Sequence, residues 1–230
     1  MLLTPAEVES LTGLRHGSPH SLLGLHPLGD GTGMVGRAHL PGAQEVEIVA
    51  VHEKTLPVLK LKRVGDTDLF EGVTRAAKRV YAYDLRVKWA DGQVSQGRDP
   101  FSFWPTVGDT DLHLFNEGNH RRLYDALGAH LKNLDGVSGT SFAVWAPNAQ
   151  RLSVVGDFNA WDGRRHPMRR LGVSGVWEIF LPGVAAGAHY KYELCDAQGQ
   201  LLPQRADPYA THTEGEVLAA LGRVQLNEPI

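Results

Sequence analysis

The sequence has a single cysteine, Cys195, and no apolar run of the length that a membrane span requires, about 18 residues. One cysteine excludes an internal disulfide and is typical of a reducing compartment. The first residues, MLLTPAEVESLTG, lack the basic start and the long apolar stretch of a secretory signal peptide. We therefore expect a cytoplasmic protein without a membrane partner.

A large excess of charge of one sign is also absent. The formal net charge is −3 and no basic stripe stands out, so we expect no nucleic-acid partner. With 230 residues, of which 42% are apolar and 21% charged, the chain has room for about one or two globular domains. One local group of arginines is interrupted by other residues, and we interpret it as a solvated loop: Arg164, Arg165, Arg169 and Arg170.

Motifs for metal, phosphate or nucleophilic chemistry are missing. The eleven histidines are dispersed, without an HExxH motif or paired-ligand spacing. Neither a GxSxG elbow nor a phosphate-cradling glycine loop is present. The series Asp157-x-Asn159-x-x-Asp162 resembles a calcium loop but lacks the later glutamate, so we reject it. We expect no metal and no cofactor.

What the sequence does contain is a series of short alternating segments. In 81–87, Tyr81, Tyr83, Leu85 and Val87 share one face, with polar residues opposite, which is the pattern of a strand with one wet face. Similar segments occur at 34–40, 46–51, 58–61 and 69–72, and again from residue 141 at intervals of about ten.

Only short helices are expected beside these strands. One begins at Pro5, capped by Thr4 with Glu7 completing a capping box, and ends at Gly13. A second is expected over 119–128, with Leu123 and Leu127 four residues apart on one face. The pattern predicts an all-β fold with short connecting helices.

An internal repeat divides the chain. At an offset of about 107 residues, Pro41 falls next to Pro147, and Phe70-Glu71 falls on Trp177-Glu178. The Tyr81–Leu85 segment likewise matches Tyr190–Leu194, and Asp99-Pro100-Phe101 matches Asp207-Pro208-Tyr209. We therefore expect two tandem immunoglobulin-like β-sandwiches. Their predicted boundaries are 1–33 for an N-terminal helix and lead-in, 34–104 for the first sandwich, 105–138 for a helical connector, 139–210 for the second sandwich and 211–230 for a tail.

Several stretches resemble the N-terminal part of bacterial 1,4-α-glucan (glycogen) branching enzymes: PHSLLGLHP, RLYDALGAH, FAVWAPNAQRLSVVGDFNAWDGRRHPMRR, GVWEIFLPG, YKYEL and ADPYA. The resemblance covers roughly residues 19–210. It implies two β-sandwiches ahead of a catalytic (β/α)8 barrel, the second sandwich being a family-48 carbohydrate-binding module. It also implies an α-glucan partner, such as glycogen or a maltooligosaccharide, and contact with the barrel.

Candidate sugar-binding residues lie in the second repeat only. Trp161 ends a polar loop and offers a flat apolar surface on which a pyranose ring could stack. In the family-48 modules, a tryptophan of this loop stacks on sugar and a lysine matching Lys191 bonds hydroxyls. Asn159 is a minor hydroxyl partner or a turn residue. The alternative for Trp161, of equal weight, is packing against a neighbouring domain.

One departure from the family weakens the expected affinity. A second stacking tryptophan follows a Gly-Gln turn in kinase-type modules, whereas Leu201 follows Gly199-Gln200 here. One ring covering on the order of 100 Å² supplies roughly 2.5 kcal/mol gross, which predicts a dissociation constant near or weaker than about 1 mM.

The sequence therefore favours the glucan-binding and positioning part of a branching enzyme. The family transfers an α-1,4 chain to a 6-hydroxyl with retention, using an Asp nucleophile and a Glu acid/base on barrel strands. No βα-repeating region is present here, so no catalytic residue is assigned and the chain is expected to be inactive alone. The alternative is a stand-alone scaffold protein in which Trp161 anchors a partner protein. A third reading is an enzyme whose site the sequence does not reveal.

Overall fold

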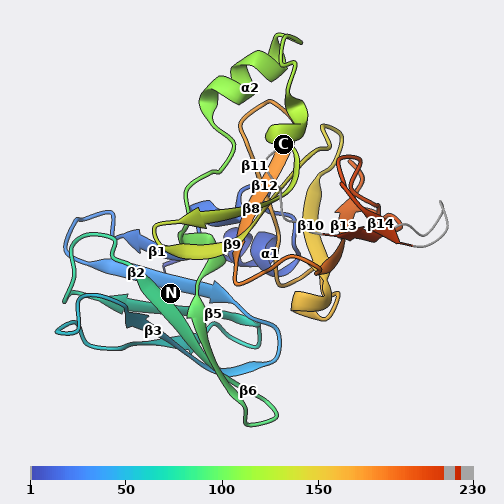
Figure 1. The fold of residues 1–230 in the computed structure, drawn as a ribbon. Coiled ribbons are helices and arrows are strands. Elements are labelled where there is room, and N and C mark those ends of the chain that lie inside the picture. Colours follow the sequence, from blue (N-terminus) through green and yellow to red (C-terminus); the bar gives the residue numbers. More distant parts are fainter. Residues whose placement is uncertain (1, 215–220, 224–230) are drawn as a thin grey trace. The chain divides into compact units, whose positions relative to one another are not determined.

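A computed structural model describes residues 2–214 and 221–223, and it divides the chain into two compact units between Ser102 and Phe103. Figure 1 shows that strands make up most of both units. The all-β prediction is therefore confirmed. In the part of the chain that the structure describes, no helix has the length and apolar character needed to cross a bilayer.

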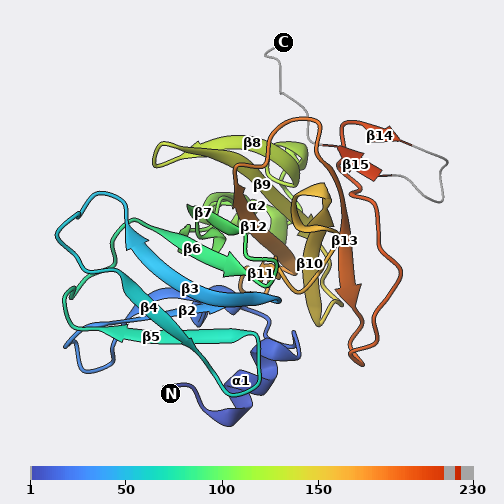
Figure 2. The same cartoon turned by 90° about the horizontal axis from the view of Figure 1, so that it is seen from below.

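The first unit is built on one curled seven-stranded sheet with the order β1-β2-β5-β4-β3-β6-β7. β4 changes partners along its length: Leu59 and Leu61 pair with β3, whereas Lys62 and Arg63 pair with β5. A strand that passes from one layer to the other turns a single sheet into a sandwich, and Figure 2 shows the two layers. Its elements are α1 (Pro5–Thr12), η1 (Pro19–Ser21), β1 (Gly24–Pro27), β2 (Met34–His39), β3 (Ala43–Ala50), β4 (Leu59–Arg63), β5 (Leu69–Thr74), β6 (Tyr83–Trp89), β7 (Val94–Arg98) and η2 (Pro100–Ser102).

The core of the first unit lies between these layers. Tyr81, Tyr83, Leu85 and Val87 are all buried in it, as the alternation predicts. Gly36 on β2 permits the close approach of the layers, because a Cβ there would lie 2.3 Å from Ile48 Cδ1. The helix predicted at Pro5 is present with its capping box and ends at Gly13.

The second unit has two four-stranded sheets, β10-β13-β15-β14 and β11-β12-β9-β8. Phe142, Trp177, Ile179, Tyr190 and Tyr192 are fully buried between them. The elements of this unit are α2 (Asp109–Asn116), η3 (Leu123–Asp125), β8 (Gly128–Leu134), β9 (Val137–Trp145), β10 (Arg151–Gly156), η4 (Asp157–Asn159), β11 (Arg169–Arg170), β12 (Val176–Pro182), β13 (His189–Cys195), β14 (Thr213–Glu214) and β15 (Leu221–Arg223).

Both sandwiches contain the same buried tyrosine–aspartate corner. Tyr83 donates its hydroxyl hydrogen to Asp99 Oδ2 at 2.6 Å. Tyr190 and Tyr192 donate to Asp207 Oδ2 at 2.7 and 3.1 Å. In each case the main-chain N–H two residues after the aspartate donates to Oδ1, at 3.0 and 2.8 Å. Equivalent corners support the internal repeat that the sequence predicts.

The repeat extends further towards the N-terminus than the sequence comparison indicates. β1 and β8 both follow a 3-10 turn and start at a glycine with positive φ, 96° for Gly24 and 105° for Gly128. His26 and His130, two residues later, each place Nε2 at 2.7 and 2.9 Å from the carbonyl oxygen three residues back. Each sandwich therefore includes an edge strand that hydropathy alone does not reveal, since β1 has only four residues and β8, with seven, lacks a clear alternation of burial.

One helix prediction is wrong, and one helix was not predicted. The helix expected over 119–128 is a single 3-10 turn at Leu123–Asp125, where Leu127 N donates to Leu123 O but the ladder does not continue. A helix occurs instead at Asp109–Asn116. Trp145 lies within a strand, which predicts a core or interface residue; it is 52% exposed and its Nε1 donates to Ser174 O at 3.2 Å, so it is not in the core and an interface role stays a prediction.

The arginine group is not uniformly a solvated loop either. Arg169 is buried, with Nε 2.8 Å from Glu178 Oε2 and Nη1 donating to Phe103 O. Glu178 Oε1 in turn accepts the Thr106 main-chain N–H. This buried ion pair therefore fastens the segment that precedes α2 to the face of the sheet.

Candidate functional site

The loop that carries Trp161 follows β10 and is held in an unusual backbone conformation. Ala160 and Trp161 both adopt positive φ, 54° and 61°, which non-glycine residues rarely do. The Trp161 main-chain N–H donates to Gly156 O at 3.1 Å and so ties the loop back to the end of β10. Backbone strain of this kind persists only where surrounding contacts enforce it, and it is common at binding sites. The main chain therefore presets the position of the Trp161 ring.

Asn159 supplies most of those contacts. Its side chain is buried, with the residue 3% exposed. Oδ1 accepts the Gly156 N–H at 2.9 Å, and Nδ2 donates to Val154 O at 2.9 Å. Nδ2 also lies 2.9 Å from His166 Nδ1. Both ends of the Asn159 amide are thus engaged within the loop, which favours the turn-shaping role over the hydroxyl-binding one.

His166, which is partly exposed, completes this network. Burial lowers the pKa of its imidazole to about 4, with a further contribution from the charge of Arg165. A neutral ring has one nitrogen that accepts a hydrogen bond, and Nδ1 does so from Asn159 Nδ2. The loop is therefore built around a neutral histidine at physiological pH.

Asp157 joins the Trp161 loop to the start of β13. Asp157 Oδ2 accepts hydrogen bonds from His189 Nδ1 at 2.8 Å and from the His189 main-chain N–H at 3.2 Å. These bonds lower the pKa of the Asp157 carboxyl, and a hydrogen bond from the Trp161 side chain contributes to the same shift. The indole is half-buried. A ring whose backbone is already fixed needs little further ordering to stack on a sugar.

Lys191 lies on β13 between two core tyrosines. Tyr190 and Tyr192 are fully buried, as predicted, and Lys191 is partly exposed on the opposite face. In the sheet register Lys191 is opposite Val155, one residue before Gly156, to which the Trp161 main chain is bonded. The fold therefore brings Trp161 and Lys191 to the same end of the β10–β13 pair, with Asn159 buried beneath the loop.

Three residues of this loop network were not singled out as partners by the sequence. Asp157 and His189 are 32 residues apart in the chain, and His166 follows Asn159 by seven. Their pairing depends on how β10 and β13 align and on how the loop returns to β10 at Pro167. No local spacing encodes that. At the position of a second stacking ring, Leu201 is exposed on the strand-like bridge to Cys195.

Comparison with known families decides where the chain belongs. Residues 4–101 match the N-terminal domain of alpha-1,4-glucan branching enzyme GlgB, and residues 126–210 match carbohydrate-binding module 48, the isoamylase N-terminal domain. The chain is therefore similar to the N-terminal regions of 1,4-alpha-glucan branching enzymes. The family-48 match includes the whole Trp161 loop and Lys191.

Individual relatives agree with this assignment. The chain is 48% identical over 209 residues to 1,4-alpha-glucan branching enzyme GlgB of Roseobacter denitrificans, and 51% identical over 199 residues to that of Rubrobacter xylanophilus. These alignments cover 90% and 86% of this chain but only 28% and 26% of the relatives. The chain therefore spans about a quarter of the length of the enzymes it matches.

Solved structures give a more distant likeness. The pullulanase PulA of Klebsiella pneumoniae aligns over 90% of this chain and 21% of its own length, with 19% identity and a TM-score of 0.36. A pullulanase of Bacillus subtilis in complex with maltose aligns over 90% of this chain and 27% of its own, with 17% identity and a TM-score of 0.37.

Proposed function

We propose that this chain is the glucan-binding and glucan-positioning N-terminal part of a cytoplasmic 1,4-alpha-glucan branching enzyme that acts in glycogen biosynthesis. Both sandwiches are assigned to the immunoglobulin-like type. Transfer of an α-1,4 chain to a 6-hydroxyl is the work of a glycosyltransferring catalytic domain outside this chain, with which the two sandwiches associate. The chain itself supplies no catalytic residue.

The observation that carries the proposal is the anchored Trp161. A left-handed turn, the buried Asn159 and the Asp157 carboxylate hold the ring at the end of a family-48 sandwich. The apolar face of a pyranose stacks on such a ring, and Lys191 lies at the same end of the β10–β13 pair to donate to sugar hydroxyls. Asn159 acts by positioning the loop.

The affinity expected from this site is low. One ring face covering on the order of 100 Å² supplies roughly 2.5 kcal/mol before ordering costs, so the dissociation constant for a short oligosaccharide lies near or above about 1 mM. Weak binding is effective on a polymer because repeated contacts and tethering raise the local concentration. The module therefore positions a long glucan rather than retaining a small one.

Affinity electrophoresis in native gels containing glycogen tests the proposal. The 230-residue chain should migrate more slowly in glycogen than in a plain gel. Trp161→Ala should remove most of that retardation and Lys191→Ala should reduce it. Trp104→Ala is the matched control, because Trp104 belongs to the same unit, is 86% exposed and lies outside the loop.

Two results would contradict the proposal. Migration of the unchanged chain that glycogen does not slow would favour the alternative, in which Trp161 anchors a partner protein. Equal losses in Trp161→Ala and Trp104→Ala would show that the retardation does not come from the loop. Iodine staining of amylose after incubation with the chain tests for branching directly, and no change in absorbance is expected.

A further inference from the structure

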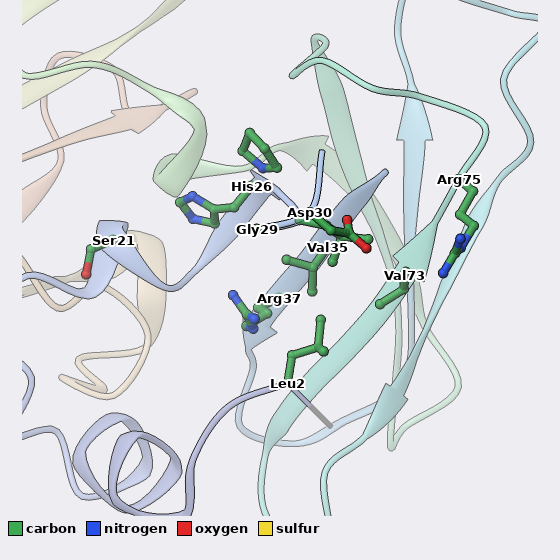
Figure 3. A pocket seen from close by; sticks show the side chains of 11 residues that line it. Leu2, Ser21, His26, Gly29, Asp30, Val35, Arg37, Val73 and Arg75 are labelled. Atoms are coloured by element: carbon green, nitrogen blue, oxygen red, sulfur yellow. The ribbon is translucent and has the colours of Figure 1, made fainter. Parts of the chain in front are cut away.

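The first unit has a groove on the outer face of β1, β2 and β5, with a volume of about 890 Å³ (Figure 3). In the sheet register His26, Val35 and Val73 lie opposite one another in one row. Arg37 lies opposite Glu71 in the next row. Paired residues of antiparallel strands point to the same face. The alternate residues, such as Met34 and Phe70, belong to the core, so the groove lies on the face turned away from it.

The groove combines an aliphatic floor with polar walls. Val35, Val73 and Leu2 supply the apolar surface, and Val73 remains 46% exposed. In Figure 3 the labelled polar side chains lie around this floor: Ser21, His26, Asp30, Arg37 and Arg75. From Glu71, the partner of Arg37, to Arg75 the strand advances by four residues, about 13 Å. The groove is therefore longer than a single pyranose ring.

The charges in the groove are balanced. Arg37 Nε lies 3.0 Å from Glu71 Oε2, and both side chains are more than nine-tenths buried. Arg37 Nη1 also donates to Leu22 O. Asp30 and Arg75 also line the groove, and the charge of Arg75 makes a minor contribution to lowering the pKa of Asp30, after the hydrogen bonds from Thr32 and the opposing effect of burial. With Glu71 included, two arginines and two carboxylates lie here, so an anionic ligand would meet no excess of positive charge.

Donors and acceptors are both available to a ligand. His26 Nε2 lies 2.7 Å from Leu23 O, and since a carbonyl only accepts, Nε2 carries the proton and Nδ1 is the acceptor. The Asp30 carboxylate is a second acceptor, and the exposed Arg75 guanidinium is a donor. A sugar hydroxyl both donates and accepts, whereas phosphate mainly accepts. An apolar floor bordered by mixed donors and acceptors thus fits a neutral sugar chain with C–H faces and hydroxyl edges.

We propose that this groove is a second binding site for a neutral α-glucan segment, on the sandwich whose loops carry no stacking aromatic. Val73 and Leu2, the exposed apolar residues of the groove, pack against the C–H faces of the sugar rings with Val35 beneath them, and His26, Asp30 and Arg75 bond the sugar hydroxyls. The identity of the sugar rests on the proposed function, but the site does not involve Trp161. Two weak sites on one chain raise the avidity for a long glucan and leave short ones weakly bound.

Titration with maltoheptaose, followed by NMR on the whole chain, tests the two sites separately. The Val35 and Val73 methyl signals report on the groove, and the indole N–H signal of Trp161 reports on the loop. In Trp161→Ala the groove methyls should still shift with maltoheptaose. Val73→Asp should weaken the maltoheptaose binding that the remaining Val35 methyls report by about fivefold or more, because it replaces the exposed part of the floor with a charge. Val94→Asp, at a 63% exposed strand position of the same unit, is the matched control and should leave it unchanged.

Arg75→Ala gives a second check, because it removes a hydroxyl donor and should weaken the response of the groove methyls to maltoheptaose. Arg79→Ala is its control and should leave that response unchanged, since both arginines are exposed in the same unit. Inorganic phosphate is titrated in parallel and should not shift the groove methyls. Groove methyls that respond to phosphate but not to maltoheptaose would overturn the choice of a neutral ligand. If maltoheptaose shifts the Trp161 indole and leaves the groove methyls unmoved, the second site is refuted while the proposed function stands. The reverse pattern would retain the groove and reject the loop.

Discussion

Replacing Asn159 with alanine separates positioning of the Trp161 loop from direct contact with sugar. The change removes three contacts of 2.9 Å, to Gly156 N, Val154 O and His166 Nδ1. A buried hydrogen bond contributes about 1 kcal/mol net, and its loss costs more where a partner stays buried without water. The second sandwich should therefore lose about 3 kcal/mol of unfolding free energy.

Urea unfolding followed by tryptophan fluorescence measures this loss. Four of the five tryptophans, at positions 104, 145, 161 and 177, belong to the second unit, so the signal reports mainly on that sandwich. Asn159→Asp is the informative companion variant, because it keeps an acceptor for Gly156 N and removes the donor to Val154 O and His166. It should cost at least as much as alanine, because it places a carboxylate oxygen beside the Val154 carbonyl oxygen and the acceptor nitrogen of His166 at a buried position.

Asn159→Ala is then compared with the unchanged chain in glycogen gels, under conditions where the variant remains folded. Loss of stability together with partial loss of retardation is the expected result, because the ring is present but no longer held. The reasoning is refuted if Asn159→Ala unfolds within about 0.5 kcal/mol of the unchanged chain and yet loses all retardation. Asn159 would then be a direct sugar ligand, and the hydrogen bonds that it makes would not hold the loop.

Three further predictions concern stability. Burial raises the pKa of Asp99 to about 6. The protonated carboxyl therefore contributes about 3 kcal/mol of stability below pH 4, and this contribution is lost as the pH rises through 6. Asp99→Asn should flatten the dependence of the unfolding free energy on pH, as measured by urea titrations followed by circular dichroism. Glu178→Ala should cost about 3–5 kcal/mol of unfolding free energy, since it leaves the buried Arg169 unpaired, whereas Arg164→Ala at an exposed pair should change little. Ala160→Gly should stabilise the second unit by up to about 1 kcal/mol, because its φ is 54°, and a lower melting temperature would contradict that reasoning.

Much of the strand content could be predicted because a strand's side chains alternate with a period of two. The segment 81–87 shows this most clearly, with its four apolar residues all in the core. The tandem arrangement followed from paired motifs such as Asp99-Pro100-Phe101 and Asp207-Pro208-Tyr209, which the structure shows in equivalent tyrosine corners. Edge strands β1 and β8 were missed, since β1 has too few residues for a period to be seen and the seven residues of β8 do not alternate clearly in burial.

The candidate site was predictable only in part. Trp161 and Lys191 could be chosen from the loop and strand pattern together with the family resemblance. The Asn159–His166 contact and the Asp157–His189 contact could not, because each joins residues that the sheet register brings together. The groove over β1, β2 and β5 was also invisible in the sequence, since its residues come from three strands and the N-terminal segment.

The sequence alone therefore determined the all-β class, the two repeats, and the side of each strand on which a residue lies, because these depend on local periodicity and repeated motifs. Tertiary structure decided which polar side chains are buried together and which apolar ones remain exposed. Arg169 is paired inside the second unit, although its group was interpreted as a solvated loop, and Trp145 is half-exposed, although its place in a strand is as typical of the core as of an interface. Burial of a side chain depends on the segments that cover it, and those segments are distant in the chain.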